Sequence, residues 1–149
     1  HNHTLRKLLE PLVRDTPIRA SFLAHIAIEL LLDHLLIQQQ LLNPARLYDH
    51  LEQVKESSIR RYLSFIAGVD ADRFMHFYTR FVQSRYILDY ADVANLSYAL
   101  FNICKRVWSF EPQAHHHQEL QAILQCYMAE NMQDFRLVYQ YVEDRLSDL

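Results

Sequence analysis

Four of the five polar side chains in the largely apolar run of residues 20–37 recur at every fourth residue. These are Ser21, His25, Glu29 and Asp33, called the polar stripe below. Because an α-helix turns by about 100° per residue, a four-residue step drifts by only about 40°, so the four share one narrow face. A helix that is apolar on its other faces is normally buried. A buried carboxylate is unfavourable unless it is paired or bound to a metal, so the two acids need a partner.

Carboxylate oxygen and imidazole nitrogen are ligand atoms for Mn²⁺, Fe²⁺ and Zn²⁺. Glu29 and Asp33 are one helical turn apart and can aim at one point, and His34 lies about 100° round from Asp33. Asp33, His34 and Glu29 are therefore candidate metal ligands. Glu29 and His25 are the candidate catalytic bases, since either can accept a proton from a bound water.

A structural interpretation of the polar stripe stays open beside this one. The stripe would then be a thin solvent-facing strip whose acids pair with Arg14, Arg19 or an arginine of another helix, and His25 would bond to a carbonyl. The triplet at residues 115–117 is all histidine, and a solvated loop is its expected state. His3, in the pair His1-x-His3, is a possible additional ligand.

Composition limits the class of protein. The chain has 149 residues, half of them apolar, and a single glycine, Gly68. That scarcity excludes phosphate-cradling glycine loops and dinucleotide-binding fingerprints. A net charge of −3 gives no support for a nucleic-acid partner. Two cysteines without zinc or disulfide spacing favour a reducing, cytoplasmic setting. We expect no membrane span, because one Asp at a helix centre opposes insertion by about 2.5–3.5 kcal/mol.

Apolar spacing and helix-start residues predict six helical segments and hence a compact, single all-α domain over residues 1–149. The segments are expected at residues 4–14, 16–42, 44–55 with a further turn at 57–68, 70–82, 92–107 and 118–146. Helix starts are expected at Thr16-Pro17, Asn43-Pro44 and Asp70. The aromatic residues spaced along 74–81 are expected in the core. Because the chain opens on His1 and not on Met, we expect that it lacks an N-terminal segment.

A resemblance to a known family starts at Glu29-x3-Asp33-His34. Acyl carrier protein phosphodiesterases carry a helix of the form hydrophobic–Asp-x3-Asp-His–hydrophobic, and here that helix reads IAIELLLDHLL. The likeness continues through FMHFYTRFVQSRYILDYADVANLSYALFNICKRV, where aromatic residues alternate with polar ones before a Lys-Arg pair. It covers residues 3–110.

The resemblance implies an all-α fold like that of HD-domain metal-dependent phosphohydrolases. It implies a divalent cation, Mn²⁺ first, with Fe²⁺ or Mg²⁺ as alternatives, and hydrolysis of the phosphodiester that joins 4′-phosphopantetheine to acyl carrier protein. Asp33 and His34 match the family's Asp-His pair, Glu29 matches the preceding Asp, and His3 matches an upstream His. The implied partner is an acidic acyl carrier protein of fatty acid metabolism.

That partner is expected to dock near basic pairs, which are Arg60-Arg61 and Lys105-Arg106. The alternative function is a non-catalytic helical domain that binds a ligand or a protein in an aromatic groove. A third interpretation is a helical-bundle metal protein of the di-iron kind, which would need a second Glu-x-x-His-like helix. The sequence does not give the oligomeric state.

Overall fold

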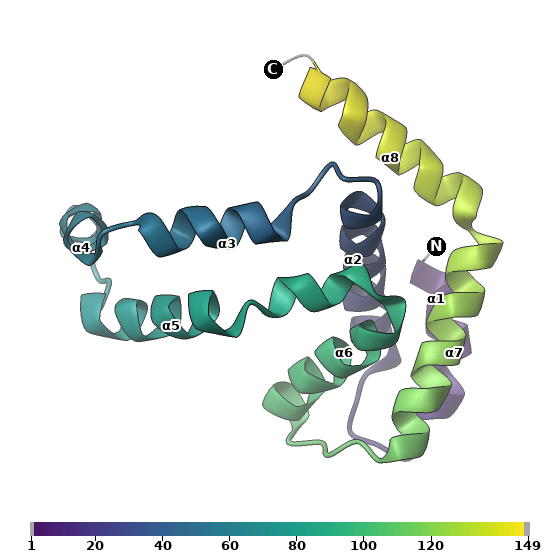
Figure 1. The fold of residues 1–149 in the computed structure, drawn as a ribbon. Helices are drawn as coiled ribbons and strands as arrows, with labels where there is room; N and C mark the ends of the chain where they lie inside the picture. The colour runs from purple at the N-terminus through teal and green to yellow at the C-terminus, as the bar shows by residue number, and fades with distance from the viewer. Residues whose placement is uncertain (1, 148–149) are drawn as a thin grey trace. The chain divides into compact units, whose positions relative to one another are not determined.

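The computed structural model describes residues 2–147, and these form helices and connecting turns without any β-strand, which confirms the all-α class (Figure 1). The elements are α1 (Asn2–Val13), α2 (Ala20–Gln38), α3 (Pro44–Gln53), α4 (Glu56–Leu63), α5 (Ala71–Ser84), η1 (Tyr86–Ala91, a 3₁₀-helix), α6 (Val93–Trp108), α7 (Ala114–Glu130) and α8 (Met132–Ser147). The closer likeness to HD-domain proteins stays a prediction.

The contacts divide the chain into two compact units. The larger unit comprises residues 1–42 and 90–149, and the smaller unit comprises residues 43–89. The expectation of one domain over the whole chain stays a prediction, and each unit is described by itself below.

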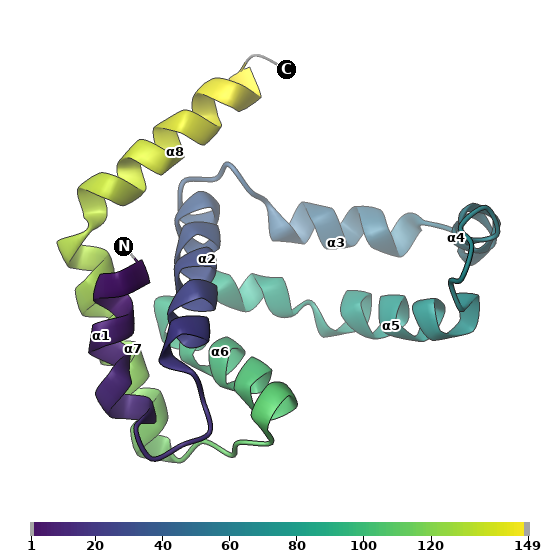
Figure 2. The same ribbon diagram turned by 180° about the vertical axis from the view of Figure 1, so that it is seen from behind.

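Helix α2 is the central element of the larger unit, where it contacts α1, α6, α7 and α8 (Figure 2). Its buried side is formed by Leu23, Ala24, Ala27, Leu30, Leu31, His34 and Leu35. The apolar members of this set pack with buried leucines of α1, α6 and α7 into one hydrophobic core. Burial of this apolar surface is the main favourable contribution to the free energy that holds α2 in place, and α2 in turn positions the polar stripe.

By length and by a mean hydropathy of 1.7, α2 would suffice to cross a membrane, and 39% of that window is buried inside the fold. The core helix of a folded domain meets the same two criteria. The expectation that this helix does not span a membrane stays a prediction.

The start of α2 differs from the sequence prediction. Thr16 does not cap the helix; its hydroxyl donates to the carbonyl of Val13 at 2.9 Å and accepts from the amide of Ile18 at 3.2 Å. The threonine thus closes the turn after α1, and α2 begins only at Ala20, with Arg19 as its N-cap residue. A hydroxyl that stabilises a turn and one that caps a helix have the same local sequence pattern.

The single long C-terminal helix predicted over residues 118–146 is wrong, because α7 ends at Glu130 and α8 begins at Met132 (Figure 1). The Asn131 side chain donates to the carbonyl of Tyr127 at 2.8 Å. The backbone amide of Asn131 donates to the same carbonyl at 3.1 Å, so Asn131 ends α7 as its C-cap residue.

In the smaller unit, α3 and α5 lie side by side and α4 contacts α5 (Figure 1). Asn43 accepts from the amide of Arg46, and Asp70 accepts from the amide of Arg73, both at 3.0 Å, so these two predicted helix starts are confirmed. The hydroxyl of Tyr78 donates to the carbonyl of Leu51 at 2.6 Å. The two cap bonds satisfy amides at helix starts that would otherwise lack partners, and the Tyr78 bond joins α5 to the end of α3.

The aromatic residues of α5 meet the sequence prediction of a core only in part, because Phe74, Tyr78 and Phe81 are half-buried and Phe77 is exposed. Met75 and Val82 are the buried residues of this helix, whereas Phe77 is 63% exposed. Phe77 stacks on Phe81 at a centroid distance of 6.1 Å, so the rings cover one another along the helix surface. Helical spacing identifies a shared face but not which face is buried.

Candidate functional site on helix α2

The polar stripe follows the side of α2 that is open to solvent. Ser21, His25 and Glu29 are exposed, and Asp33, near the C-terminal end, is half-buried. The imidazole Nε2 of His25 lies 3.2 Å from Oε1 of Glu29, with 62% and 57% of the two side chains exposed. The acids do not pair with Arg14 or Arg19 in the described structure. Glu29 therefore has His25, a member of the same polar stripe, as its partner.

Asp33 is the unusual member of the polar stripe. Its carboxylate is half-buried, and it makes no hydrogen bond or ion pair within residues 2–147. Burial raises the pKa of Asp33 above its ordinary value, and the negative charge of Glu29 raises it further. A desolvated acid beside a second acid, without a compensating cation, is typical of functional sites.

His34 lies on the buried side of α2 and is only 6% exposed. Its Nδ1 is 2.8 Å from the carbonyl oxygen of Tyr90, and because a carbonyl only accepts, Nδ1 must carry the proton and donate. In the neutral ring Nε2 then holds the lone pair. Metal-ligating histidines commonly show this arrangement, in which the second ring nitrogen donates to a carbonyl and fixes the tautomer.

The structure does not bring the predicted ligands into one cluster. Among the described residues there is no group of three or more His, Cys, Asp or Glu side chains placed to hold a metal ion. Glu29 and Asp33 are neighbours, whereas His34 is held towards Tyr90 and His3 is exposed in the first turn of α1. A site with three or more protein ligands is therefore not formed by this part of the chain.

The histidine triplet is not a solvated loop, contrary to the sequence prediction. It lies in the first turn of α7, where Nδ1 of His116 accepts from the amide of Gln113 at 2.9 Å and completes a capping box. His117 stacks on Tyr98 at 4.2 Å and meets the edge of Phe101 at 5.0 Å. These rings are structural contacts between α6 and α7, which the sequence pattern did not reveal.

This histidine cluster predicts acid destabilisation. Burial lowers the pKa of His116 and of His117 below the usual 6.5, and the neighbouring histidine of each lowers it further. The unfolded chain then binds more protons, so the free energy of unfolding falls as pH drops below about 6.5. Solvent screening limits the loss to less than about 1 kcal/mol per ring.

Urea unfolding at pH 7 and pH 5 measures this effect. The double variant His116→Gln/His117→Gln should lose part of the pH dependence, whereas His76→Gln, at an exposed position on α5, should keep it. An unchanged pH dependence in the double variant would contradict the assignment.

The four basic residues expected to meet a partner are in different situations. Arg60 pairs with Glu56 at 2.6 Å and with Asp72 at 2.7 Å, and Lys105 pairs with Glu111. Arg61 and Arg106 have no acidic partner within residues 2–147. Only these two remain available as single charges, since an internal ion pair presents little net field to a partner.

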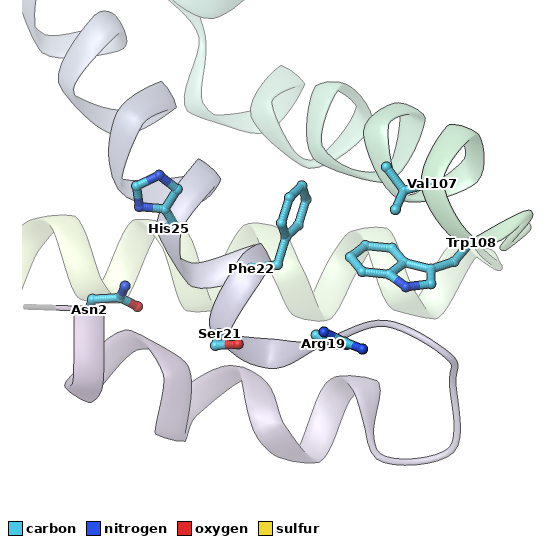
Figure 3. A pocket seen from close by; sticks show the side chains of 7 residues that line it. All are labelled: Asn2, Arg19, Ser21, Phe22, His25, Val107 and Trp108. Carbon is cyan, nitrogen blue, oxygen red and sulfur yellow. The ribbon is translucent and has the colours of Figure 1, made fainter.

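An open pocket of about 600 Å³ lies at the N-terminal end of the polar stripe (Figure 3). Its lining comes from α1, from the start of α2 and from the end of α6, and consists of Asn2, Arg19, Ser21, Phe22, His25, Val107 and Trp108. Arg19 and Trp108 were not predicted as site residues. No local pattern marks them, because they come from segments that only the fold of the larger unit brings together.

Comparisons with known proteins add no relative. A scan against protein-family models, a search of curated proteins and a search of solved structures each return no match to this chain.

Proposed function

We propose that this protein is a metal-dependent phosphodiesterase of the acyl carrier protein phosphodiesterase type, which releases 4′-phosphopantetheine from holo acyl carrier protein. The observation that carries the proposal is the carboxylate of Asp33, half-buried, beside Glu29 and without any partner in the described chain. A cation would remove the electrostatic cost of this arrangement. The sequence resemblance around Asp33-His34 supplies the substrate class.

The residues present fit a divalent cation that prefers oxygen ligands, such as Mg²⁺ or Mn²⁺. Mg²⁺ is commonly held by one or two carboxylates together with waters and substrate phosphate oxygens, and carboxylate oxygen also suits Mn²⁺. Glu29 and Asp33 would be those carboxylates, and Mn²⁺ is the ion we propose first. When bound, such an ion neutralises phosphate charge and makes water a better nucleophile.

His25 supplies the proton chemistry of the proposed reaction. If the Nε2 proton of His25 is directed to Glu29, whose Oε1 is 3.2 Å away, Nδ1 is left as the atom that accepts a proton. Glu29 then orients the imidazole, as the acid of a catalytic triad does. Glu29 therefore serves both as a metal ligand and as a positioning residue for His25.

The proposed partner is an acidic carrier protein, and Arg61 and Arg106 are the cations of the predicted basic pairs that are free to meet it. A positive patch raises the rate at which an acidic partner associates and makes that rate salt-dependent. Each arginine belongs to a different unit, so each is a separate candidate contact.

The experiment is an incubation of the protein with holo acyl carrier protein and Mn²⁺, followed by intact-mass analysis. The proposal expects conversion of the holo form to the apo form, with free 4′-phosphopantetheine as the second product. Holo carrier protein that stays intact with Mn²⁺, Mg²⁺ and Fe²⁺ would contradict the proposal.

A second candidate is a non-catalytic domain that binds the same kind of acidic partner. The observation that favours it is the exposure of aromatic side chains in the smaller unit, where Tyr62 is 69% and Phe65 is 78% exposed, next to the unpaired Arg61. Exposed aromatic and arginine side chains are frequent anchors of protein interfaces. Under this alternative the same incubation yields a stable complex with intact holo carrier protein.

A further inference from the structure

The pocket at the start of α2 has one strongly polar wall. Arg19 is the N-cap residue of α2 and Ser21 lies in its first turn, and both are exposed side chains without a hydrogen-bond or ion-pair partner in the described chain (Figure 3). His25 follows one turn later on the same face. No acidic residue lines the pocket, so the Arg19 charge is not neutralised within it.

The rest of the lining is largely aromatic. Phe22 and Trp108 meet edge to face, with ring centroids 5.1 Å apart and an interplanar angle of 88°. This geometry is the favourable one for aromatic pairs, so the two rings form a firm apolar surface. Val107 extends that surface along the end of α6.

A ligand that satisfies both walls must carry an anionic group and an apolar group. The guanidinium fork matches the oxygens of a phosphate, to which it donates two parallel hydrogen bonds, and a serine hydroxyl can donate a third. We propose that this pocket binds an amphipathic phosphate ester, with the phosphate at Arg19 and Ser21 and the apolar group against Trp108 and Phe22. The inference does not rest on the proposed hydrolase.

Trp108 makes the test specific, because it is the only tryptophan in the 149 residues. Its fluorescence therefore reports on this pocket alone. Titration with phenyl phosphate in EDTA should give a saturable change in emission. Inorganic phosphate and phenol, each of which contacts one wall only, should bind at least about tenfold more weakly.

Two variants locate the binding. Arg19→Ala should weaken phenyl phosphate binding about tenfold or more, since it removes the charged hydrogen-bond donor of the pocket. The matched control is Arg136→Ala on α8, which removes the same charge at an exposed position outside the pocket and should leave binding unchanged. Arg19→Lys keeps the positive charge but loses the two parallel N–H donors of the guanidinium, so it should bind phenyl phosphate more weakly than the natural protein does.

Circular dichroism checks that each variant keeps its helical content. The proposal is overturned if phenyl phosphate gives no saturable change, if inorganic phosphate or phenol binds equally well, or if folded Arg19→Ala and Arg19→Lys bind like the natural protein. If Arg19→Ala fails to fold, the comparison of Arg19→Lys with Arg136→Ala decides the question.

Discussion

Asp33→Asn is expected to lower hydrolysis of holo acyl carrier protein by about 100-fold or more while the protein stays folded. The change removes one of two carboxylates proposed to hold the cation and leaves the shape of the side chain nearly unchanged. Loss of a group that acts on a reacting centre commonly lowers rates by about 10²–10⁴. The rate of conversion from holo to apo carrier protein, followed by mass spectrometry, measures the effect.

The same variant separates a functional acid from a structural one. Because the pKa of Asp33 is raised in the folded state, its ionised form lowers the free energy of unfolding as pH rises through that pKa. In EDTA at pH 7, Asp33→Asn should therefore be as stable as the natural protein, or more stable by up to about 1 kcal/mol, since water screens the half-buried group. A loss of about 3–5 kcal/mol would instead indicate a buried ion pair.

The matched control for this prediction is Asp15→Asn. Asp15 is an exposed acid between α1 and α2 that makes no ion pair in the described chain. The substitution removes the same charge outside the polar stripe, so activity and stability should both stay unchanged. Equal losses in Asp15→Asn and Asp33→Asn would show a general effect of charge and not of the proposed site.

Phe101→Ala is expected to destabilise the larger unit by about 3–5 kcal/mol, the usual effect of removing a large buried ring. Phe101 is 1% exposed and packs against Phe110 at 6.0 Å and against His117 at 5.0 Å. The alanine would leave a cavity where α6 meets the first turn of α7. Urea unfolding followed by circular dichroism gives the free energy.

Val107→Ala is the control for Phe101→Ala, because Val107 lies on the same helix and is 54% exposed. Exposed substitutions away from special features usually change stability by no more than about 0.5 kcal/mol. If the two variants unfolded at the same urea concentration, the packing described for α6 and α7 would be contradicted.

Local chemistry explains which parts of the fold could be predicted from the sequence. Asn43, Asp70 and Asp92 each accept a hydrogen bond from an amide two or three residues later. A short local sequence pattern is therefore enough to predict these helix starts. The apolar run of α2 likewise predicts a central helix without any tertiary information. The break at Asn131 was missed, because apolar spacing continues on both sides of it.

In the candidate site, too, the features set by local helix geometry could be predicted and those set by distant residues could not. The polar stripe follows from helical geometry alone, and the nearness of His25 to Glu29 is an i, i+4 contact. The orientation of His34 is set by the carbonyl of Tyr90, and the pocket needs Trp108 beside Phe22. Each of those partners lies more than fifty residues away along the chain, so no periodicity could indicate them.

The central claim is that Glu29 and Asp33 hold a divalent cation, and thermal unfolding of the intact protein in EDTA and in rising concentrations of Mn²⁺ tests it most directly. A ligand that binds only the folded state raises the midpoint, by an amount equivalent to about 2.7 kcal/mol at one hundred times its dissociation constant. The account predicts that Mn²⁺ raises the midpoint of the natural protein and of Asp15→Asn, and does not raise that of Asp33→Asn. A midpoint that no Mn²⁺, Mg²⁺ or Fe²⁺ concentration raises, or an equal rise in Asp33→Asn, would contradict it.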